Sequence, residues 1–329
     1  MKKMKILLTV CITIAMLTVP ANAQIKKVAQ SGLQFLKIDM SARAAAMGGS
    51  YIMINNDASS VFYNPAGLAK MQNTWDFNVI RTQWIADISY LGGAAAYNME
   101  NWGTVGLSFM TASYGDDIIG TRYATNAQGY VETGKLSVGA YTVGLSYAKA
   151  LTDKFMIGGQ VKYCYQHLGD SYIDTTGTLQ RNEVKGFAFD FGTIFYPGWK
   201  SFRLGMSVRN FSPEFKYYQD GFELPLTFTI GFAMDVMDFI GKHEDPLLIS
   251  VDAVHPRDYS DRINLGAEYS FMNSVFLRAG YKFNYDNEGF TAGLGLMQNF
   301  AGVNVKVDYS YSTMKYFDGI HRISFGFSY

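Results

Sequence analysis

The side chains best suited to acid–base, nucleophilic or metal chemistry are few in this 329-residue chain and lie far apart in it. Its histidines are His167, His243, His255 and His321, and none has a partner at the spacing of a metal site or a catalytic pair. Three of them fall near expected strand ends or loops and His243 falls in a turn, so we expect solvated side chains. The histidines therefore predict neither a metal site nor a catalytic base.

Other motifs for catalysis or binding are incomplete. The chain has no Gly-x-Ser-x-Gly elbow, and Gly293-Leu294-Gly295 lacks the third glycine of a dinucleotide fingerprint. The Asp116-Asp117 pair has the carboxylates of a divalent-cation or polysaccharide site, but a solvated acidic loop tip explains it better. No Ser/His pair suits a phospholipase. We predict no catalytic residue, no cofactor and no metal, and hence a protein that is not an enzyme.

Composition excludes two classes of protein. The chain has 28 basic and 28 acidic residues, and this balance argues against a nucleic-acid partner, because phosphate binding needs a basic face. An apolar content of 48% excludes a disordered chain. The 24 Phe and 23 Tyr exceed what a soluble enzyme needs and call for an explanation.

The first residues have the composition of a secretory leader. Three lysines among the first five residues precede an apolar run over 6–19, and Ala21-Asn22-Ala23 forms a small-residue cleavage signal. The apolar run is shorter than the roughly 17 residues of a spanning helix. We predict residues 1–23 as a signal peptide cleaved after Ala23. Its removal leaves Cys164 as the only cysteine, so an internal disulfide is excluded.

From residue 75 onward, apolar residues alternate with small or polar ones. Examples are Val143 to Tyr147, Leu226 to Val236 and Val303 to Tyr309. Because successive side chains of a strand point to opposite faces, each segment has one apolar face and one small or polar face. The pattern predicts an all-β protein.

Two architectures fit this alternation, a soluble sandwich and a membrane barrel. The outer face of a sandwich meets water and needs many Lys and Glu, yet here the second face is mostly Gly, Ser, Ala and Thr. In a membrane barrel the apolar face meets lipid and the other face lines the lumen. No stretch after the leader has the roughly 20 apolar residues of a membrane helix, which leaves a closed barrel.

The aromatic surplus gathers near segment ends, where the lipid headgroups favour Tyr and Trp rings. These residues are Trp75, Trp84, Tyr90, Trp102, Tyr196, Trp199, Tyr281 and Tyr329. We therefore predict a transmembrane antiparallel β-barrel in a bacterial outer membrane, with outer-membrane lipid as its first partner.

The number of strands can be counted from the alternation. The expected strands are 75–82, 88–99, 102–113, 138–150, 154–167, 185–196, 201–211, 224–237, 246–254, 261–272, 274–284, 289–299, 302–313 and 319–329. This gives about 14 strands over 75–329, an even number as outer-membrane barrels require. Connections after even strands are short, apart from 238–245, whereas several after odd strands are long, which is the asymmetry of periplasmic turns and outer loops.

The last strand carries a pattern of its own, with an apolar residue at every second position and a terminal aromatic. Its members are Ile323, Phe325, Phe327 and Tyr329. This pattern resembles the C-terminal signal by which the barrel-assembly machinery recognises its clients, and an ordinary closing strand is the alternative.

Ten charged residues occupy the polar phase of their strands. They are Lys162, Asp190, Arg209, Asp235, Asp252, Glu268, Arg278, Lys282, Lys306 and Asp308. A cation facing lipid at the midplane costs roughly 2–4 kcal/mol, so these side chains should point into the lumen. They form either cross-barrel ion pairs that fill the lumen or a hydrophilic conduit.

Residues 24–74 do not alternate, and we predict that they form an N-terminal hatch or plug with short helices in the mouth of the lumen. The stretch 40–47 favours a helix that Gly48-Gly49 ends, and 51–54 suits a short strand. A second helical turn is expected over 59–63, broken by Asn64-Pro65-Ala66-Gly67.

This segment resembles the PorV/PorQ family, which belongs to the wider FadL-like group of 14-stranded outer-membrane barrels. The resemblance rests on Ser41 to Gly49, with Arg43, Gly48 and Gly49, and on Asn56 to Ala69, with Asp57 and Asn64-Pro65-Ala66-Gly67. The Asn-Pro-Ala-Gly-Leu run is shared with fatty-acid transporters of the FadL type, where it lies in the hatch.

The resemblance implies two functions. PorV and PorQ are components of type IX secretion, and PorV binds secreted cargo at the outer membrane. The first hypothesis is therefore a protein that docks exported cargo and secretion components. FadL passes hydrophobic molecules through its wall, so the second hypothesis is transport of hydrophobic small molecules.

Overall fold

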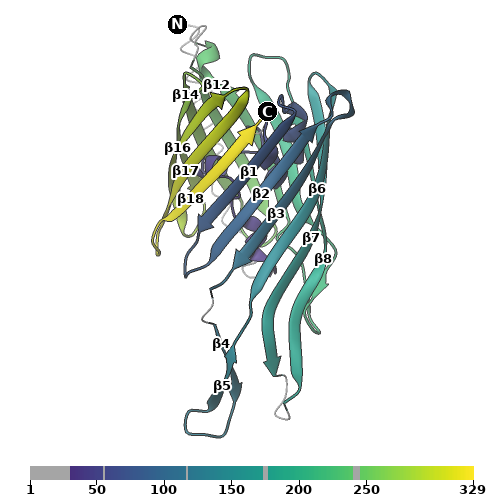
Figure 1. Ribbon diagram of the computed structural model, residues 1–329, viewed down its shortest axis with the longest axis vertical. Helices are drawn as coiled ribbons and strands as arrows, with labels where there is room; N and C mark the ends of the chain where they lie inside the picture. The colour runs from purple at the N-terminus through teal and green to yellow at the C-terminus, as the bar shows by residue number, and fades with distance from the viewer. Residues whose placement is uncertain (1–29, 55, 116–117, 173–176, 240–244) are drawn as a thin grey trace.

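The computed structural model describes residues 30–54, 56–115, 118–172, 177–239 and 245–329. Within this part of the chain, fourteen antiparallel strands pair in a closed ring, which confirms the predicted all-β barrel (Figure 1). The predicted signal peptide, Asp116-Asp117 and His243 lie outside the described residues. The strands of the wall are β1 (Trp75–Gln83), β2 (Ser89–Asn98), β3 (Thr104–Ser113), β6 (Gly139–Thr152), β7 (Phe155–Tyr172), β8 (Leu179–Phe195), β9 (Arg203–Phe211), β12 (Thr227–Asp235), β13 (Leu247–Pro256), β14 (Arg262–Phe271), β15 (Val275–Phe283), β16 (Glu288–Phe300), β17 (Val303–Met314) and β18 (Ile320–Ser328).

Each wall strand pairs with its neighbours in the sequence, and the first pairs with the last. The closing ladder between β1 and β18 runs from Asp76↔Ser328 to Gln83↔His321. Two small hairpins interrupt the sequence order and lie outside the ring: β4 (Ile119–Tyr123) with β5 (Tyr130–Lys135), and β10 (Phe215–Lys216) with β11 (Gly221–Phe222). An up-and-down barrel closed in this way has no free edge in its ring.

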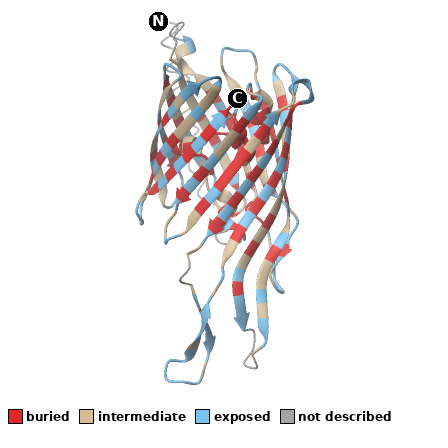
Figure 2. Ribbon diagram, in the orientation of Figure 1, coloured by how far each residue is buried: buried red, intermediate tan, exposed pale blue. Residues whose placement is uncertain are grey.

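The wall is apolar outside and polar or small inside. In β18 burial alternates residue by residue: Phe325 is 54% exposed, whereas Arg322 and Ser324 are each 1% exposed. In Figure 2, buried and exposed residues alternate along the wall strands that face the viewer. A soluble sandwich has polar residues outside and apolar residues inside, which is the reverse of this arrangement. The arrangement seen here is that of a barrel whose outer face meets lipid.

The two ends of the barrel differ. Short connections such as 153–154 and 301–302 join strands at the end where β1 begins and β18 stops. The opposite end carries longer segments, including the β4–β5 hairpin and the overhanging ends of β7 and β8 (Figure 1). We call these the short-turn end and the loop end, and the barrel class places the short-turn end in the periplasm.

The helices of the described residues are all short: η1 (Gln34–Lys37), α2 (Ala42–Ala46), η2 (Ala58–Phe62), η3 (Pro65–Lys70), η4 (Glu100–Trp102) and η5 (Val236–Phe239). None of them has the length and apolar character needed to cross a bilayer as a helix. The first four belong to residues 30–74, which we call the plug.

The plug lies inside the barrel and extends through most of its length. Near its start, Ser31 bridges Glu223 of the loop end, and at its finish Trp75 exchanges backbone hydrogen bonds of 2.9 Å with Tyr329 at the short-turn end. In between, α2 contacts β15 to β18 and η3 contacts β6 to β8, on different sectors of the wall. The plug thus occupies the length of the lumen and not only its mouth.

Several aromatic residues expected at the lipid interface face inward. Trp84 and Tyr90 contact one another in the lumen, with ring centroids 6.1 Å apart, and Tyr90 is 5% exposed. The ammonium of Lys70 in the plug lies over the ring of Tyr196 in a cation–π contact. Trp75, Trp102, Trp199, Tyr281 and Tyr329 are exposed as expected.

Candidate functional site in the barrel lumen

The α2 turn rests directly on the wall because both surfaces carry glycine. Ser41 caps its start by accepting a hydrogen bond from the backbone N–H of Ala44 at 3.3 Å. Gly48 ends it at φ +65°, and a Cβ there would lie 2.8 Å from the carbonyl oxygen of Leu265. A Cβ on Gly280 of β15 would collide with the backbone of Gly48. Any side chain at either glycine would push the plug off the wall.

The Asn64-Pro65-Ala66-Gly67 run separates two helices: η2 ends at Phe62, as expected, and the run then begins η3. Asn64 caps η3 by accepting from the backbone N–H of Ala66 at 3.1 Å, and Pro65 occupies the first turn. The Asn64 amide also donates to the carbonyls of Ile52 and Thr193, at 3.1 and 3.2 Å. The Asn-Pro motif therefore joins the plug to β8.

Of two neighbouring segments, one needs correction and the other agrees with its predicted helical turn over 59–63. Residues 51–54 form a turn instead of a strand, with the Ile54 N–H bonded to the carbonyl of Tyr51 at 3.1 Å. The second helical turn is the 3-10 helix η2, capped by Asp57. A buried tight turn satisfies its backbone hydrogen-bonding groups locally. The apolar composition of 51–54 suits such a turn as well as a strand, so it did not distinguish the two.

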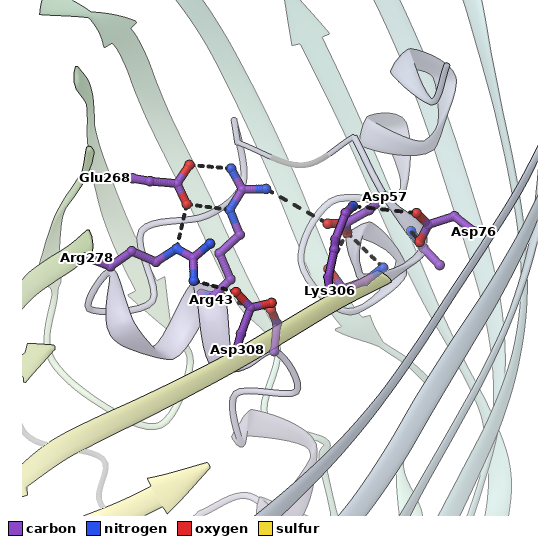
Figure 3. Close-up of polar contacts among 11 residues, drawn as sticks. Arg43, Asp57, Asp76, Glu268, Arg278, Lys306 and Asp308 are labelled. Atoms are coloured by element: carbon purple, nitrogen blue, oxygen red, sulfur yellow. Dashed lines mark hydrogen bonds and ion pairs between the residues drawn. The ribbon is translucent and has the colours of Figure 1, made fainter. Parts of the chain in front are cut away.

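Arg43 lies at the centre of a charge network between the plug and the wall (Figure 3). Its Nε and Nη2 donate to the two carboxylate oxygens of Glu268 at 2.7 and 2.5 Å. The same carboxylate accepts from Arg278 Nε at 2.6 Å, and Arg278 Nη1 donates to Asp308 at 2.6 Å. Burial alone would lower the pKa of Arg43, but Glu268 outweighs it and raises the pKa, so the guanidinium stays charged.

A second group of charges lies beside the first. Asp57 is 3.9 Å from Arg43 Nη1, and it caps η2 through the N–H and hydroxyl of Ser59. Asp76 at the start of β1 accepts from the N–H of Ala58 at 2.9 Å and lies 3.8 Å from Lys306. The plug thus contributes one charged member, Asp57, to this group, and the wall contributes Asp76 and Lys306 (Figure 3).

Three further inward charges contact the plug. Asp252 accepts from the backbone N–H groups of Tyr51 and Ile52 at 2.8 and 3.2 Å. Lys282 lies 3.0 Å from Asp39, and Arg209 donates to the Phe62 carbonyl at 2.8 Å. These contacts hold successive plug segments against different strands.

The remaining predicted charges have other roles. Lys162 and Asp190 pair at 2.8 Å on neighbouring strands. Asp235 lies apart from the network and accepts from the N–H groups of Met237 and Leu247, both at 3.0 Å, in the β12–β13 turn. The structure therefore gathers Arg43, Glu268, Arg278 and Asp308 but not Asp235.

The plug divides the lumen into two chambers. The periplasmic chamber, about 390 Å³, is bordered by Arg43, Asp57 and Lys306. The outer chamber, about 470 Å³, is bordered by Tyr63, Arg209 and other residues of the loop end. No lining residue is shared by the two chambers.

A stack of four side chains forms the partition. The Arg43 guanidinium lies 5.7 Å from the ring of Tyr51, the rings of Tyr51 and Tyr63 are 5.0 Å apart, and Arg209 lies 5.8 Å from Tyr63. Tyr51 is 0% and Tyr63 is 3% exposed. Burial raises the pKa of both phenols, so they stay neutral. Arg43 at one end of the stack lines the periplasmic chamber, and Tyr63 and Arg209 at the other end line the outer chamber, so the stack lies between the two.

The sequence analysis missed several lumenal residues. Lys37 pairs with Asp258 of the β13–β14 connection at 3.0 Å, and Arg203 donates to the Met53 carbonyl at 2.6 Å. Arg322 is buried in the outer chamber. Arg203 and Arg322 occupy the polar phase of their strands, so the alternation that found the other ten charges also identifies these two.

The histidines and the cysteine form no reactive cluster in the described residues. His167 lies 3.4 Å from Asp170, His255 contacts Asp261 at 2.5 Å, and His321 contacts Tyr309 at 2.6 Å. Cys164 is buried. Among described residues no three His, Cys, Asp or Glu side chains are grouped to hold a metal ion.

The final strand presents its apolar residues outward. Ile323, Phe325, Phe327 and Tyr329 are 40%, 54%, 51% and 67% exposed. Phe327 stacks on Phe77 of β1, with ring centroids 4.8 Å apart. The row faces lipid, and its role as an assembly signal stays a prediction.

A closed 14-stranded barrel with an apolar outer wall and an N-terminal plug defines an outer-membrane β-barrel protein. The fold is similar to the toluene transporter TodX of Pseudomonas putida, with 12% identity, a TM-score of 0.53, and coverage of 88% of this chain and 96% of TodX. It is similar also to a FadL homologue of Pseudomonas aeruginosa, with 12% identity, a TM-score of 0.50 and coverage of 88% and 98%. At this identity, the likeness concerns the fold.

The profile of the family "Type IX secretion system protein PorV" matches residues 21–253, which is most of the chain. The chain therefore belongs to this family, and the resemblance carried by the plug motifs is confirmed. Comparison with curated proteins gave no match.

Proposed function

We propose that this protein is a non-enzymatic dock for exported proteins at the bacterial outer membrane, working with components of type IX secretion. The family assignment supports this role. The lumenal charges fit this role as well, because Arg43, Glu268, Arg278 and Asp308 bond to one another and hold the plug to the wall.

The observation that carries the proposal is the surface of the loop end. The β4–β5 hairpin projects beyond the barrel, and its Ile119, Tyr123 and Tyr130 are 51%, 74% and 44% exposed (Figure 1). Beyond the lipid, exposed apolar side chains of this kind favour protein contacts. Because the hairpin pairs only with itself, it can present this surface without straining the wall.

Affinity purification from native outer membranes, followed by mass spectrometry, tests the role. Wild-type protein should recover secretion components and exported cargo. Replacing Tyr123 and Tyr130 by Ser should reduce that recovery several-fold, while Tyr316→Ser, an equally exposed tyrosine of another loop, should leave it unchanged. Recovery of neither class of partner with the wild-type protein would overturn the proposal.

The proposal also includes how the chain is exported and how the barrel is assembled. The leader is cleaved after Ala23, and the last strand, ending at Tyr329, is recognised by the barrel-assembly machinery. N-terminal sequencing of the membrane-embedded protein should begin at Gln24, and Phe327→Asp should reduce the assembled barrel. A mature protein that starts elsewhere, or full assembly of that variant, would contradict these steps.

A second candidate function is passage of hydrophobic small molecules, favoured by an irregularity in the wall. Between β8 and β9 the register shifts from Phe189↔Phe211 to Phe191↔Val208. At this bulge the Asp190 carboxylate accepts from the Asn210 N–H at 2.7 Å and replaces a ladder bond.

Locking the bulge tests this second function. A disulfide between cysteines at positions 189 and 211 should slow entry of N-phenyl-1-naphthylamine into proteoliposomes, and reduction should restore it. A disulfide at the regularly paired positions 193 and 206 is the matched control. Equal entry with the bulge locked and reduced would exclude passage there.

A further inference from the structure

Three arginines of the outer chamber have no carboxylate of the described residues within ion-pair distance. Arg209, Arg262 and Arg322 all line it, and the Nε atom of each is buried without a hydrogen-bond partner in the described part of the chain. They come from β9, β14 and β18, so they enter the chamber from separate sectors of the wall. Unpartnered donors of one sign in a single cavity point to an anion.

Arg322 is the most deeply buried of the three arginines. It is 1% exposed, and among the described residues its side chain makes one hydrogen bond, from Nη1 to the hydroxyl of Ser312 at 2.9 Å. Within the described residues, no carboxylate oxygen lies within 4 Å of its nitrogens. Arg322 acts on Asp39 only at longer range, since Asp39 pairs directly with Lys282. Burying a guanidinium without a direct ion-pair partner is costly, so this position favours a bound anion.

The acidic groups of the chamber are committed to other partners. Lys282 pairs with both Asp39 and Glu288, at 3.0 and 2.5 Å. Asp252 bonds to plug backbone, and Asp286 accepts from the hydroxyl of Tyr259. Burial acts to raise the pKa of Asp39, but the nearby cations, Lys282 foremost, lower it overall. The arginines thus remain available to a ligand.

An apolar wall adjoins Arg322. Its guanidinium lies 5.6 Å from the ring centroid of Trp84, which in turn packs edge-on against Tyr90. Ile85 and Ile88, from the tight turn between β1 and β2, extend this wall at the loop end. An acidic group held by Arg322 would therefore place the rest of its molecule on Trp84.

We propose that the outer chamber binds an organic anion that carries one acidic group on a compact apolar or aromatic body. The acid pairs with Arg322 and the body packs against Trp84. The chamber volume of about 470 Å³ lies within the range of small-molecule sites. This inference rests on the chamber alone and holds whether or not the protein docks cargo.

Isothermal titration of the purified full chain in non-ionic detergent tests the proposal with three probes of one skeleton: 4-phenylbutyrate, 4-phenylbutan-1-ol and 4-phenylbutylamine. The acid should bind at least tenfold more tightly than the alcohol and the amine. Arg322→Gln should abolish this preference, and Arg322→Lys should retain part of it. Lys306→Gln, a cation of the other chamber, is the control and should change nothing.

Trp84→Ala should weaken the acid and the alcohol alike, because it removes the apolar wall. If Arg322→Gln fails to fold, Arg262→Gln at the same chamber serves in its place and should reduce the preference for the acid several-fold. Equal binding of acid and alcohol to the wild-type chain, no binding of the acid, or a preference unchanged in the folded arginine variants would each overturn the proposal.

Discussion

The contact between Arg43 and Glu268 should control how tightly the plug is held. Arg43→Gln removes the two charge-assisted hydrogen bonds of 2.7 and 2.5 Å, and the side chains involved are 19% and 6% exposed. Breaking a buried pair costs about 3–5 kcal/mol. Glu268 keeps Arg278 at 2.6 Å, so it is not left as an isolated charge and the lower figure applies.

A loss of about 3 kcal/mol corresponds to a roughly 100-fold larger population of the detached plug. Hydrogen exchange followed by mass spectrometry reads this population directly, because backbone amides of α2 exchange when the plug detaches. We expect exchange over 42–47 to accelerate by about that factor in Arg43→Gln, with the wall strands unaffected.

The matched control is Arg181→Gln, which removes the exposed ion pair between Arg181 and Glu183. Surface pairs contribute about 0–1 kcal/mol, so exchange over 42–47 should not change. If Arg43→Gln exchanged at the rate of Arg181→Gln, the argument that a buried ion pair holds the plug would be refuted.

Three further predictions concern the plug, the loop end and the outer wall. Gly280→Ala should destabilise the plug by about 1–3 kcal/mol through overpacking, seen as faster exchange of α2, whereas Gly159→Ala meets only ordinary contacts and should not. Partial burial acts to raise the pKa of Asp258, but hydrogen bonds from the plug lower it overall. The contact with Lys37 therefore stabilises the plug above about pH 4 and is lost as the pH falls through the folded-state pKa. A spin label near the start of the plug should become more mobile in acid than at neutral pH. In the Asp258→Asn variant, the same label should be equally mobile at acid and at neutral pH. Leu145→Arg, at a position 61% exposed on the outer wall, should destabilise the barrel in bilayers by about 2–4 kcal/mol in chemical unfolding; no change would mean that this face does not meet lipid.

The strand arrangement could be predicted because alternation reports both faces of a wall strand. The expected range 75–82 became β1, Trp75–Gln83, and 302–313 became β17, Val303–Met314. Charges in the polar phase were placed by the same rule, since lipid excludes them from the other face. Arg322 obeys this rule too and was overlooked.

Features beyond the lipid were harder to predict. The strands β4 and β5 lie in water on both faces, so their burial pattern does not alternate and the sequence gives no periodic signal there. The overhanging part of β8 also lies in water, and it therefore carries the charged residues Arg181 and Glu183. Trp84 was assigned to the lipid interface because ring type alone does not distinguish an interfacial side chain from a lumenal one.

The contacts of the plug depend on residues far apart in the sequence. Nothing local to Arg43 indicates that its partner is Glu268, and Gly48 meets Gly280 only once the barrel has closed. Such pairs follow from the tertiary arrangement, which one sequence without its homologues does not encode in any local pattern.

Electrical recording from the purified full-length chain in planar bilayers tests the central claim, a closed barrel whose lumen the plug divides. The wild-type protein should show no steady open-pore conductance, because the stack from Arg43 to Arg209 separates the chambers. A steady, ohmic conductance of porin size from the wild-type chain would contradict the account.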